Sequence, residues 1–193
     1  RMTDIIIKNG GTIDKFMGDC IMAFWNAPIE NTEHEDCAIQ SAIDMQKELA
    51  ILNAELKAED LPQINIGIGI NTGEALVGNM GSDQRFDYSV LGDSVNLAAR
   101  LEGQSKSYGV KTVIGPETNE SVKDSYATLQ LDMIAVKGKK EAVSIFTLVG
   151  DNKILKSKDF QTLKYKHQKI LDSYFNQKWD DALKNINNTK NLC

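Results

Sequence analysis

Residues 86–100 read FDYSVLGDSVNLAAR and carry the most informative pattern in the chain. They predict an extended segment, a Gly-Asp turn and a helix that places Asn96 and Arg100 four residues apart. Side chains at this spacing lie on the same face of a helix. An amide beside a guanidinium suits an anionic, oxygen-rich ligand, because the guanidinium fork matches the geometry of phosphate oxygens. An ordinary amphipathic helix with a polar outer face fits the same residues about equally well.

A second informative stretch, residues 12–25, reads TIDKFMGDCIMAFW. Two short apolar-rich runs are joined at Gly18-Asp19, which predicts a β-hairpin. The carboxylate of Asp19 at this turn is a candidate ligand for Mg²⁺, since magnesium sites use one or two carboxylates and leave the rest to water and phosphate. Aspartate is also a favoured turn residue when no ligand is present.

The other segments up to residue 150 alternate between helical and extended patterns. A capping box at residues 32–35 opens a helix with an apolar stripe. Residues 64–70 read INIGIGI, whose strict alternation predicts a strand with glycines that permit close approach of another backbone or a ligand. Further expected elements are a helix ending near residue 8, a strand at 111–114, a helix from Pro116 and strands at 126–136 and 143–149. This is an α+β pattern, with antiparallel hairpins and helices that cover one sheet face.

Residues 151–193 differ in character and predict an α-helical hairpin. Apolar side chains repeat there at helical spacing, at Phe160, Leu163, Ile170, Leu171, Tyr174, Trp179, Ala182, Leu183 and Ile186. The segment from Tyr174 to Ala182 is similar to one helix pair of a tetratricopeptide array. A single such pair buries its apolar face poorly. We therefore expect it to pack on the preceding domain or to begin a longer array, and it is a candidate contact for a protein partner.

The composition fits one cored domain with an appendage, because the chain has 193 residues of which 41% are hydrophobic and 25% charged. A net charge of −5 leaves no basic patch for nucleic acid. No apolar run reaches the roughly 18 residues of a membrane span, and no signal-peptide pattern occurs. Three cysteines show no metal-ligand spacing, which suits a reducing compartment. We expect a cytoplasmic domain, with any membrane anchor lying upstream in the longer protein.

Four motifs, taken in order, resemble the catalytic domain of class III nucleotidyl cyclases of the bacterial adenylyl cyclase type. They are KFMGD at 15–19, GIGINTG at 67–73, the stretch 87–100 and VKGK at 136–139. The resemblance covers residues 1–150 and implies a ferredoxin-like core, an antiparallel-rich sheet covered by helices. Residues 1–150 are thus expected to be a cyclase catalytic domain, and residues 151–193 an attached helical hairpin.

The start of the chain departs from the family pattern. The family opens its domain with a strand that bears an acidic metal ligand, in a pattern like Phe-x-Asp-Ile-x-Gly-Phe, whereas this chain begins at Arg1 within a predicted helix. The resemblance therefore implies that the first strand and the first metal aspartate lie upstream, in a longer gene product. On its own, the 193-residue chain is expected to have little or no activity.

The resemblance also implies a role for each matching residue. Asp19 corresponds to the second of two aspartates that bind two Mg²⁺ or Mn²⁺ ions. Asn96 would orient the ribose, and Arg100 would stabilise the charge on the α-phosphate in the transition state. Lys137 corresponds to the lysine that grips the terminal phosphates.

Base preference rests on Lys15 and Ser89 by the same resemblance. A lysine can donate to N1 of adenine but offers nothing to the N1–H of guanine, so Lys15 favours ATP. Ser89 departs from the Asp or Thr that usually accompanies this lysine, although its hydroxyl keeps the hydrogen-bonding capacity of threonine. The expected function is therefore an adenylyl cyclase that makes cyclic AMP and pyrophosphate from ATP.

The family acts as a head-to-tail dimer with shared active sites, so a homodimer is expected here. The metal aspartates would come from one protomer, and the five residues that bind and orient the nucleotide from the other. Two alternatives remain open from the sequence. One is a non-catalytic module for nucleotide sensing or dimerisation, and the other is a guanylyl cyclase.

Overall fold

The computed structural model describes residues 1–82, 84–135 and 142–189. The chain divides into two compact units, residues 1–122 and residues 123–193. The two most informative sequence motifs, around Gly18 and around Gly92, lie in the first unit. Lys137 lies outside the described residues.

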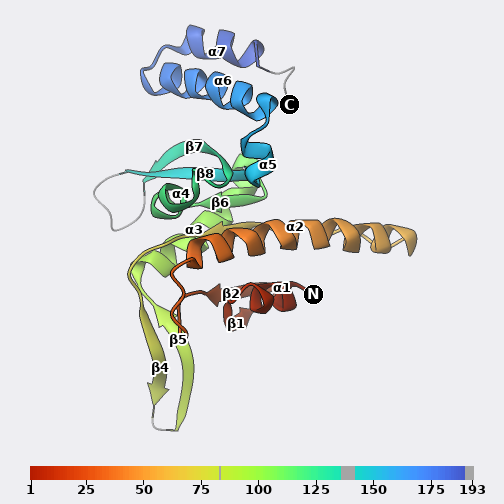
Figure 1. Ribbon diagram of the computed structural model, residues 1–193, viewed down its shortest axis with the longest axis vertical. Coiled ribbons are helices and arrows are strands. Elements are labelled where there is room, and N and C mark those ends of the chain that lie inside the picture. Colours follow the sequence, from red (N-terminus) through yellow and green to blue (C-terminus); the bar gives the residue numbers. More distant parts are fainter. Residues whose placement is uncertain (83, 136–141, 190–193) are drawn as a thin grey trace. The chain divides into compact units, whose positions relative to one another are not determined.

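The first unit alternates helices with short strands (Figure 1). In chain order its elements are α1 (Met2–Lys8), β1 (Thr12–Met17), β2 (Cys20–Phe24), α2 (His34–Ala58), β3 (Ile68–Ile70), β4 (Leu76–Ser82), β5 (Arg85–Leu91), α3 (Asp93–Tyr108), β6 (Thr112–Ile114) and α4 (Pro116–Val122).

Two antiparallel hairpins and one parallel strand pair organise this unit. β1 pairs with β2, and β4 pairs with β5 in a hairpin that extends away from the helices of the unit in Figure 1. β3 pairs with β6 in parallel. The turn between β1 and β2 contains Gly18 at a φ of +65°, which glycine adopts without steric cost from a Cβ. The hairpin predicted at residues 12–25 is confirmed.

Helix α3 packs closely against β3, because the strand carries glycine where the helix approaches. A Cβ on Gly69 would collide with the backbone of α3 at Ala98 and Glu102. The helix buries Leu97 and Leu101 on the side opposite to solvent. Gly69 thus allows the close approach of a helix backbone to the strand.

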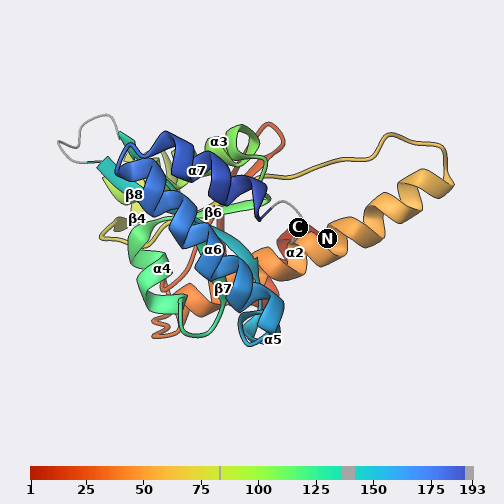
Figure 2. The same cartoon turned by 90° about the horizontal axis from the view of Figure 1, so that it is seen from above.

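The strand predicted over residues 64–70 is shorter in the structure, where only β3 is extended and paired. The segment from Ile64 to Gly67 instead follows α2 back from its far end (Figure 2). The side chain of Asn53 on α2 accepts a hydrogen bond from the Ile64 amide at 2.9 Å and donates to the Ile64 carbonyl at 2.8 Å. Backbone groups that would have joined a strand ladder are therefore satisfied by helix side chains.

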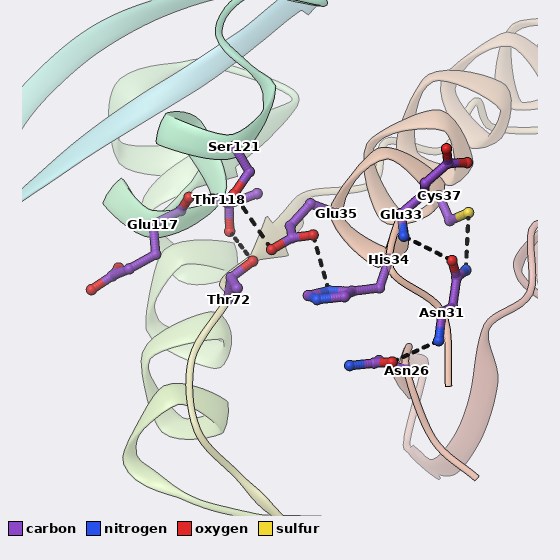
Figure 3. Close-up of polar contacts among 10 residues, drawn as sticks. All are labelled: Asn26, Asn31, Glu33, His34, Glu35, Cys37, Thr72, Glu117, Thr118 and Ser121. Atoms are coloured by element: carbon purple, nitrogen blue, oxygen red, sulfur yellow. Dashed lines mark hydrogen bonds and ion pairs between the residues drawn. The ribbon is translucent and has the colours of Figure 1, made fainter. Parts of the chain in front are cut away.

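The start of α2 also differs from the predicted capping box. The N-cap residue is Glu33, and no side-chain cap hydrogen bond is made there. The amide of Glu33 instead donates to Oδ1 of Asn31 at 2.9 Å, and the amide of Asn31 donates to Oδ1 of Asn26 at 2.7 Å (Figure 3). An Asx-type turn from Asn31 thus takes the place expected for Thr32.

Polar side chains also join the first turn of α2 to α4. Oε1 of Glu35 accepts a hydrogen bond from Ser121 at 3.4 Å, and its Oε2 lies 3.3 Å from Nδ1 of His34 (Figure 3). The hydroxyls of Thr72 and Thr118 lie 3.0 Å apart in the same region. The contact between Thr72 and Thr118 ties the segment that follows β3 to α4, the helix that follows β6.

The second unit consists of a strand pair and helices. Its elements are β7 (Ala127–Ala135), β8 (Ala142–Gly150), α5 (Asn152–Leu155), α6 (Lys158–Phe175) and α7 (Trp179–Asn187). β7 pairs with β8 in antiparallel fashion. Nε2 of His167 on α6 lies 2.6 Å from the carbonyl oxygen of Gln130, so α6 packs on β7.

The C-terminal helical hairpin is confirmed, since α6 and α7 lie side by side (Figures 1 and 2). The rings of Tyr174 and Trp179 pack edge to face with centroids 5.6 Å apart at the connection. The domain boundary at residue 150 and the likeness to a tetratricopeptide pair stay predictions. Among the described residues, no helix is both long enough and apolar enough to cross a bilayer.

Candidate active site

Lys15 and Ser89 come together although 74 positions separate them in the sequence. Strand β1 lies beside β5. The ring centroids of Phe24 on β2 and Tyr88 on β5 are 6.1 Å apart. Nζ of Lys15 donates a hydrogen bond to Oγ of Ser89 at 3.3 Å. The side chain of Lys15 keeps 46% of its surface exposed, while Ser89 is buried. The pair thus presents an ammonium group to solvent beside a fixed hydroxyl.

Asp14, which was not predicted from the sequence, completes this contact. Its side chain has no exposed surface. Oδ2 accepts a hydrogen bond from the Ser89 hydroxyl at 2.9 Å, and Oδ1 forms an ion pair with Nζ of Lys15 at 3.4 Å. The one signal in the sequence is a carboxylate inside an otherwise apolar strand next to a lysine. We name Asp14, Lys15 and Ser89 the Asp14 cluster.

Asn96 and Arg100 lie on the exposed side of α3, as their spacing predicts. The first turn of the helix is held by polar contacts to the connection between β3 and β4. The hydroxyl of Ser94 donates to the Glu74 carbonyl at 2.5 Å, and the Asn71 amide donates to the Ser94 carbonyl at 3.1 Å. A helix anchored at its first turn therefore carries the amide and the guanidinium.

Asp19 lies exposed at the turn between β1 and β2, and its carboxylate has no hydrogen-bond or ion-pair partner within the described ranges. Partial burial raises the pKa of the neighbouring Cys20 thiol, and the negative charges of Glu102 and Asp19 raise it further. The turn thus presents an accessible carboxylate, which fits a divalent cation.

A metal ion at this turn would need further ligands. In the part of the chain that the structure describes, no group of three His, Cys, Asp or Glu side chains is arranged to hold a metal. Magnesium commonly takes one or two protein carboxylates and fills its other positions with water and phosphate oxygens. Asp19 therefore fits as one ligand of such a metal site.

Of the residues predicted for the site, the structure brings Lys15 and Ser89 into hydrogen-bond contact. The Asp14 cluster offers groups that can read a purine edge, and α3 offers an amide and a cation for ribose and phosphate. Asp19 makes no contact with Lys15 or Ser89 among the described hydrogen bonds and ion pairs. Lys137 lies in the range 136–141, outside the described residues.

Comparison with known proteins matches this chain to nucleotidyl cyclases. The family model described as the adenylate and guanylate cyclase catalytic domain matches residues 2–150. Adenylate cyclase 1 of Rhizobium meliloti is 34% identical over 148 residues, which are 77% of this chain and 22% of that protein. The chain thus spans less than a quarter of the length of this relative.

Solved structures of both cyclase types share the fold. The crystal structure of the adenylyl cyclase CyaB from P. aeruginosa matches with a TM-score of 0.68 and 36% identity, over 78% of this chain and 77% of that one. The crystal structure of the guanylyl cyclase Cya2 matches with a TM-score of 0.65 and 35% identity, over 78% and 75%. The predicted class III cyclase fold is confirmed, and the chain belongs to the adenylate and guanylate cyclase catalytic domain family.

Proposed function

We propose that this domain is an adenylyl cyclase, which converts ATP into cyclic AMP and pyrophosphate. The observation that carries the proposal is the contact between Lys15 and Ser89. The exposed ammonium group of Lys15 is a donor suited to N1 of adenine, and it has no acceptor to offer to the N1–H of guanine. The names of the Rhizobium meliloti relative and of the P. aeruginosa neighbour support the same substrate.

In the reaction, the ribose 3′-oxygen forms a bond to the α-phosphorus, its proton is lost, and the bond to the pyrophosphate oxygen breaks. Arg100 would stabilise the charge that develops on the α-phosphate, and Asn96 would hold the ribose so that the 3′-oxygen is in line. Pre-aimed donors of this kind each lower the activation barrier by on the order of 3–4 kcal/mol. Lys137 would bind the terminal phosphates as a point charge.

Divalent cations, two Mg²⁺ or Mn²⁺, would be held in part by Asp19. When bound, they would lower the pKa of the 3′-hydroxyl and neutralise the charge of the triphosphate. The exposure of the Asp19 carboxylate at the turn supports this assignment.

We further propose that two copies of the chain share each active site. Asp19 would come from one copy, and the Asp14 cluster with Asn96, Arg100 and Lys137 from the other. Large apolar side chains on the two hairpins support an interface, because monomers rarely expose such patches. These exposed side chains are Phe16, Met17, Leu76, Phe86 and Leu91.

A guanylyl cyclase is the second candidate. The neighbour named guanylyl cyclase Cya2 is nearly as similar to this chain as the adenylyl cyclase is. Ser89 also differs from the aspartate or threonine expected beside an adenine-selective lysine. Because a hydroxyl can donate as well as accept, Ser89 by itself does not exclude guanine. Turnover of GTP that exceeds turnover of ATP would establish this reading.

The test is cyclic nucleotide production by the full-length protein, given ATP or GTP with Mn²⁺. We expect cyclic AMP from ATP, and no product from the Asp19→Asn variant, which keeps the size of the side chain. The matched control is Asp4→Asn, because the Asp4 side chain is 84% exposed on α1 and should leave turnover unchanged. Nucleotide binding without any product would instead indicate a non-catalytic sensing or dimerisation module.

A further inference from the structure

We propose that Asp14 is a positioning residue that sets the base preference of the nucleotide site, by fixing the direction of the Ser89 hydroxyl. The inference rests on the proposed function, since it assumes that Lys15 and Ser89 face a purine. It concerns a residue that contacts no substrate itself. The Asp14 side chain is fully buried and contacts the other two side chains of the Asp14 cluster.

Each oxygen of the Asp14 carboxylate faces a donor. Oδ2 accepts the proton of the Ser89 hydroxyl at 2.9 Å and lies 3.5 Å from the amide nitrogen of Val90. Oδ1 accepts no hydrogen bond but lies 3.4 Å from Nζ of Lys15. An asparagine in this place would turn an NH₂ group toward one of these donors, whichever way its amide were rotated. The geometry thus calls for a carboxylate.

This arrangement makes Ser89 an acceptor toward the ligand. A hydroxyl has one proton and two lone pairs. The proton goes to Asp14, and one lone pair accepts the hydrogen bond from Lys15 at 3.3 Å. The group left for a bound base is the second lone pair.

Adenine and guanine differ at the positions that such a pair can read. Adenine has an acceptor at N1 and an amino donor at position 6, whereas guanine has a donor at N1 and an oxygen acceptor at position 6. A lysine donor beside a hydroxyl that can only accept matches adenine at both positions. A Ser89 hydroxyl released from Asp14 could rotate and donate to the guanine oxygen.

The test is equilibrium binding of 3′-deoxy-ATP and 3′-deoxy-GTP, which cannot cyclise, to the full-length protein. We expect Asp14→Ala, which removes the acceptor for the Ser89 proton, to lower the preference for the adenine nucleotide by about tenfold, the worth of one hydrogen bond. Ser89→Ala should lower it by a similar factor, and the double variant should lower it no further, because Asp14 acts through the hydroxyl.

Several results would overturn the proposal. They are an unchanged preference in Asp14→Ala, equal weakening of both nucleotides, a further loss in the double variant, or no binding of either nucleotide by the wild type. Should Asp14→Ala fail to fold, the wild type still provides a test with purine riboside triphosphate, which lacks the 6-amino group. We expect it to bind about tenfold more weakly than ATP, and equal affinity would overturn the proposal.

The inference and the proposed function fail separately. Cyclic AMP production by the wild type measures the proposed function, whereas the ratio of the two dissociation constants measures the role of Asp14. A protein that makes cyclic AMP with a base preference independent of Asp14 keeps the function and loses the inference. A protein whose preference depends on Asp14 but that makes no product keeps the inference and loses the function.

Discussion

At the scale of single residues, the Asp14 cluster is a contact between strands that lie far apart in the sequence. The family resemblance predicted that Lys15 and Ser89 read the base, and the structure places them in hydrogen-bond contact. Their assignment to a base stays a prediction. Asp14 could not be predicted, because its role depends on a partner 75 positions away and a single sequence does not reveal which strands are neighbours.

Gly69 provides a prediction at the same scale. A Cβ there would lie 2.8 Å from Cα of Glu102 and would collide with further backbone atoms of α3. Neither the helix backbone nor the strand can yield easily, so Gly69→Ala should lower the free energy of unfolding by on the order of 1–3 kcal/mol. Urea denaturation followed by circular dichroism measures this.

The matched control for Gly69 is Gly103, which lies inside α3, where an added Cβ meets nothing within 4 Å. Gly103→Ala should raise the stability by about 0.5–1 kcal/mol, because alanine is the better helix former. Equal stability changes in the two variants would contradict the account of how α3 packs on β3.

At the scale of elements, the sequence predicted the two ends of the first unit better than its middle. The hairpin at Gly18, the helix after Gly92 and the short strand and helix before residue 122 follow from local turn and capping signals. The segment 64–70 and the start of α2 do not. The Ile64 amide, which the alternating pattern assigned to a strand ladder, donates instead to the side chain of Asn53. The Glu33 amide donates to the side chain of Asn31, in place of the predicted capping box.

The start of α2 gives the prediction at this scale. Asn31→Ala removes the acceptor for the Glu33 amide and should lower the free energy of unfolding by about 1 kcal/mol, as the loss of a helix cap does. Thr32→Ala should change it by less than about 0.5 kcal/mol, as typical surface substitutions do. Thermal or urea unfolding of the two variants measures the difference. A larger loss of unfolding free energy in Thr32→Ala than in Asn31→Ala would contradict this account and support the capping box.

At the scale of the whole molecule, the order of four short motifs was enough to predict the family, because each motif is local and their order is set by the chain. The α+β class and the C-terminal helical hairpin are confirmed. The active site was only partly predictable. Asp19 and the residues on β1, β5 and α3 are joined in our proposal by a second copy of the chain, which no single sequence displays.

That joining of two copies is the central claim, and mixing two inactive variants tests it most directly. Asp19→Asn and Arg100→Ala damage opposite halves of the proposed site, so each homodimer should make no cyclic AMP from ATP. In an equimolar mixture, half of the dimers would be mixed and each would hold one intact site, which restores about a quarter of wild-type activity. A mixture as inactive as its components would contradict the claim, because both residues would then serve the same site of one chain.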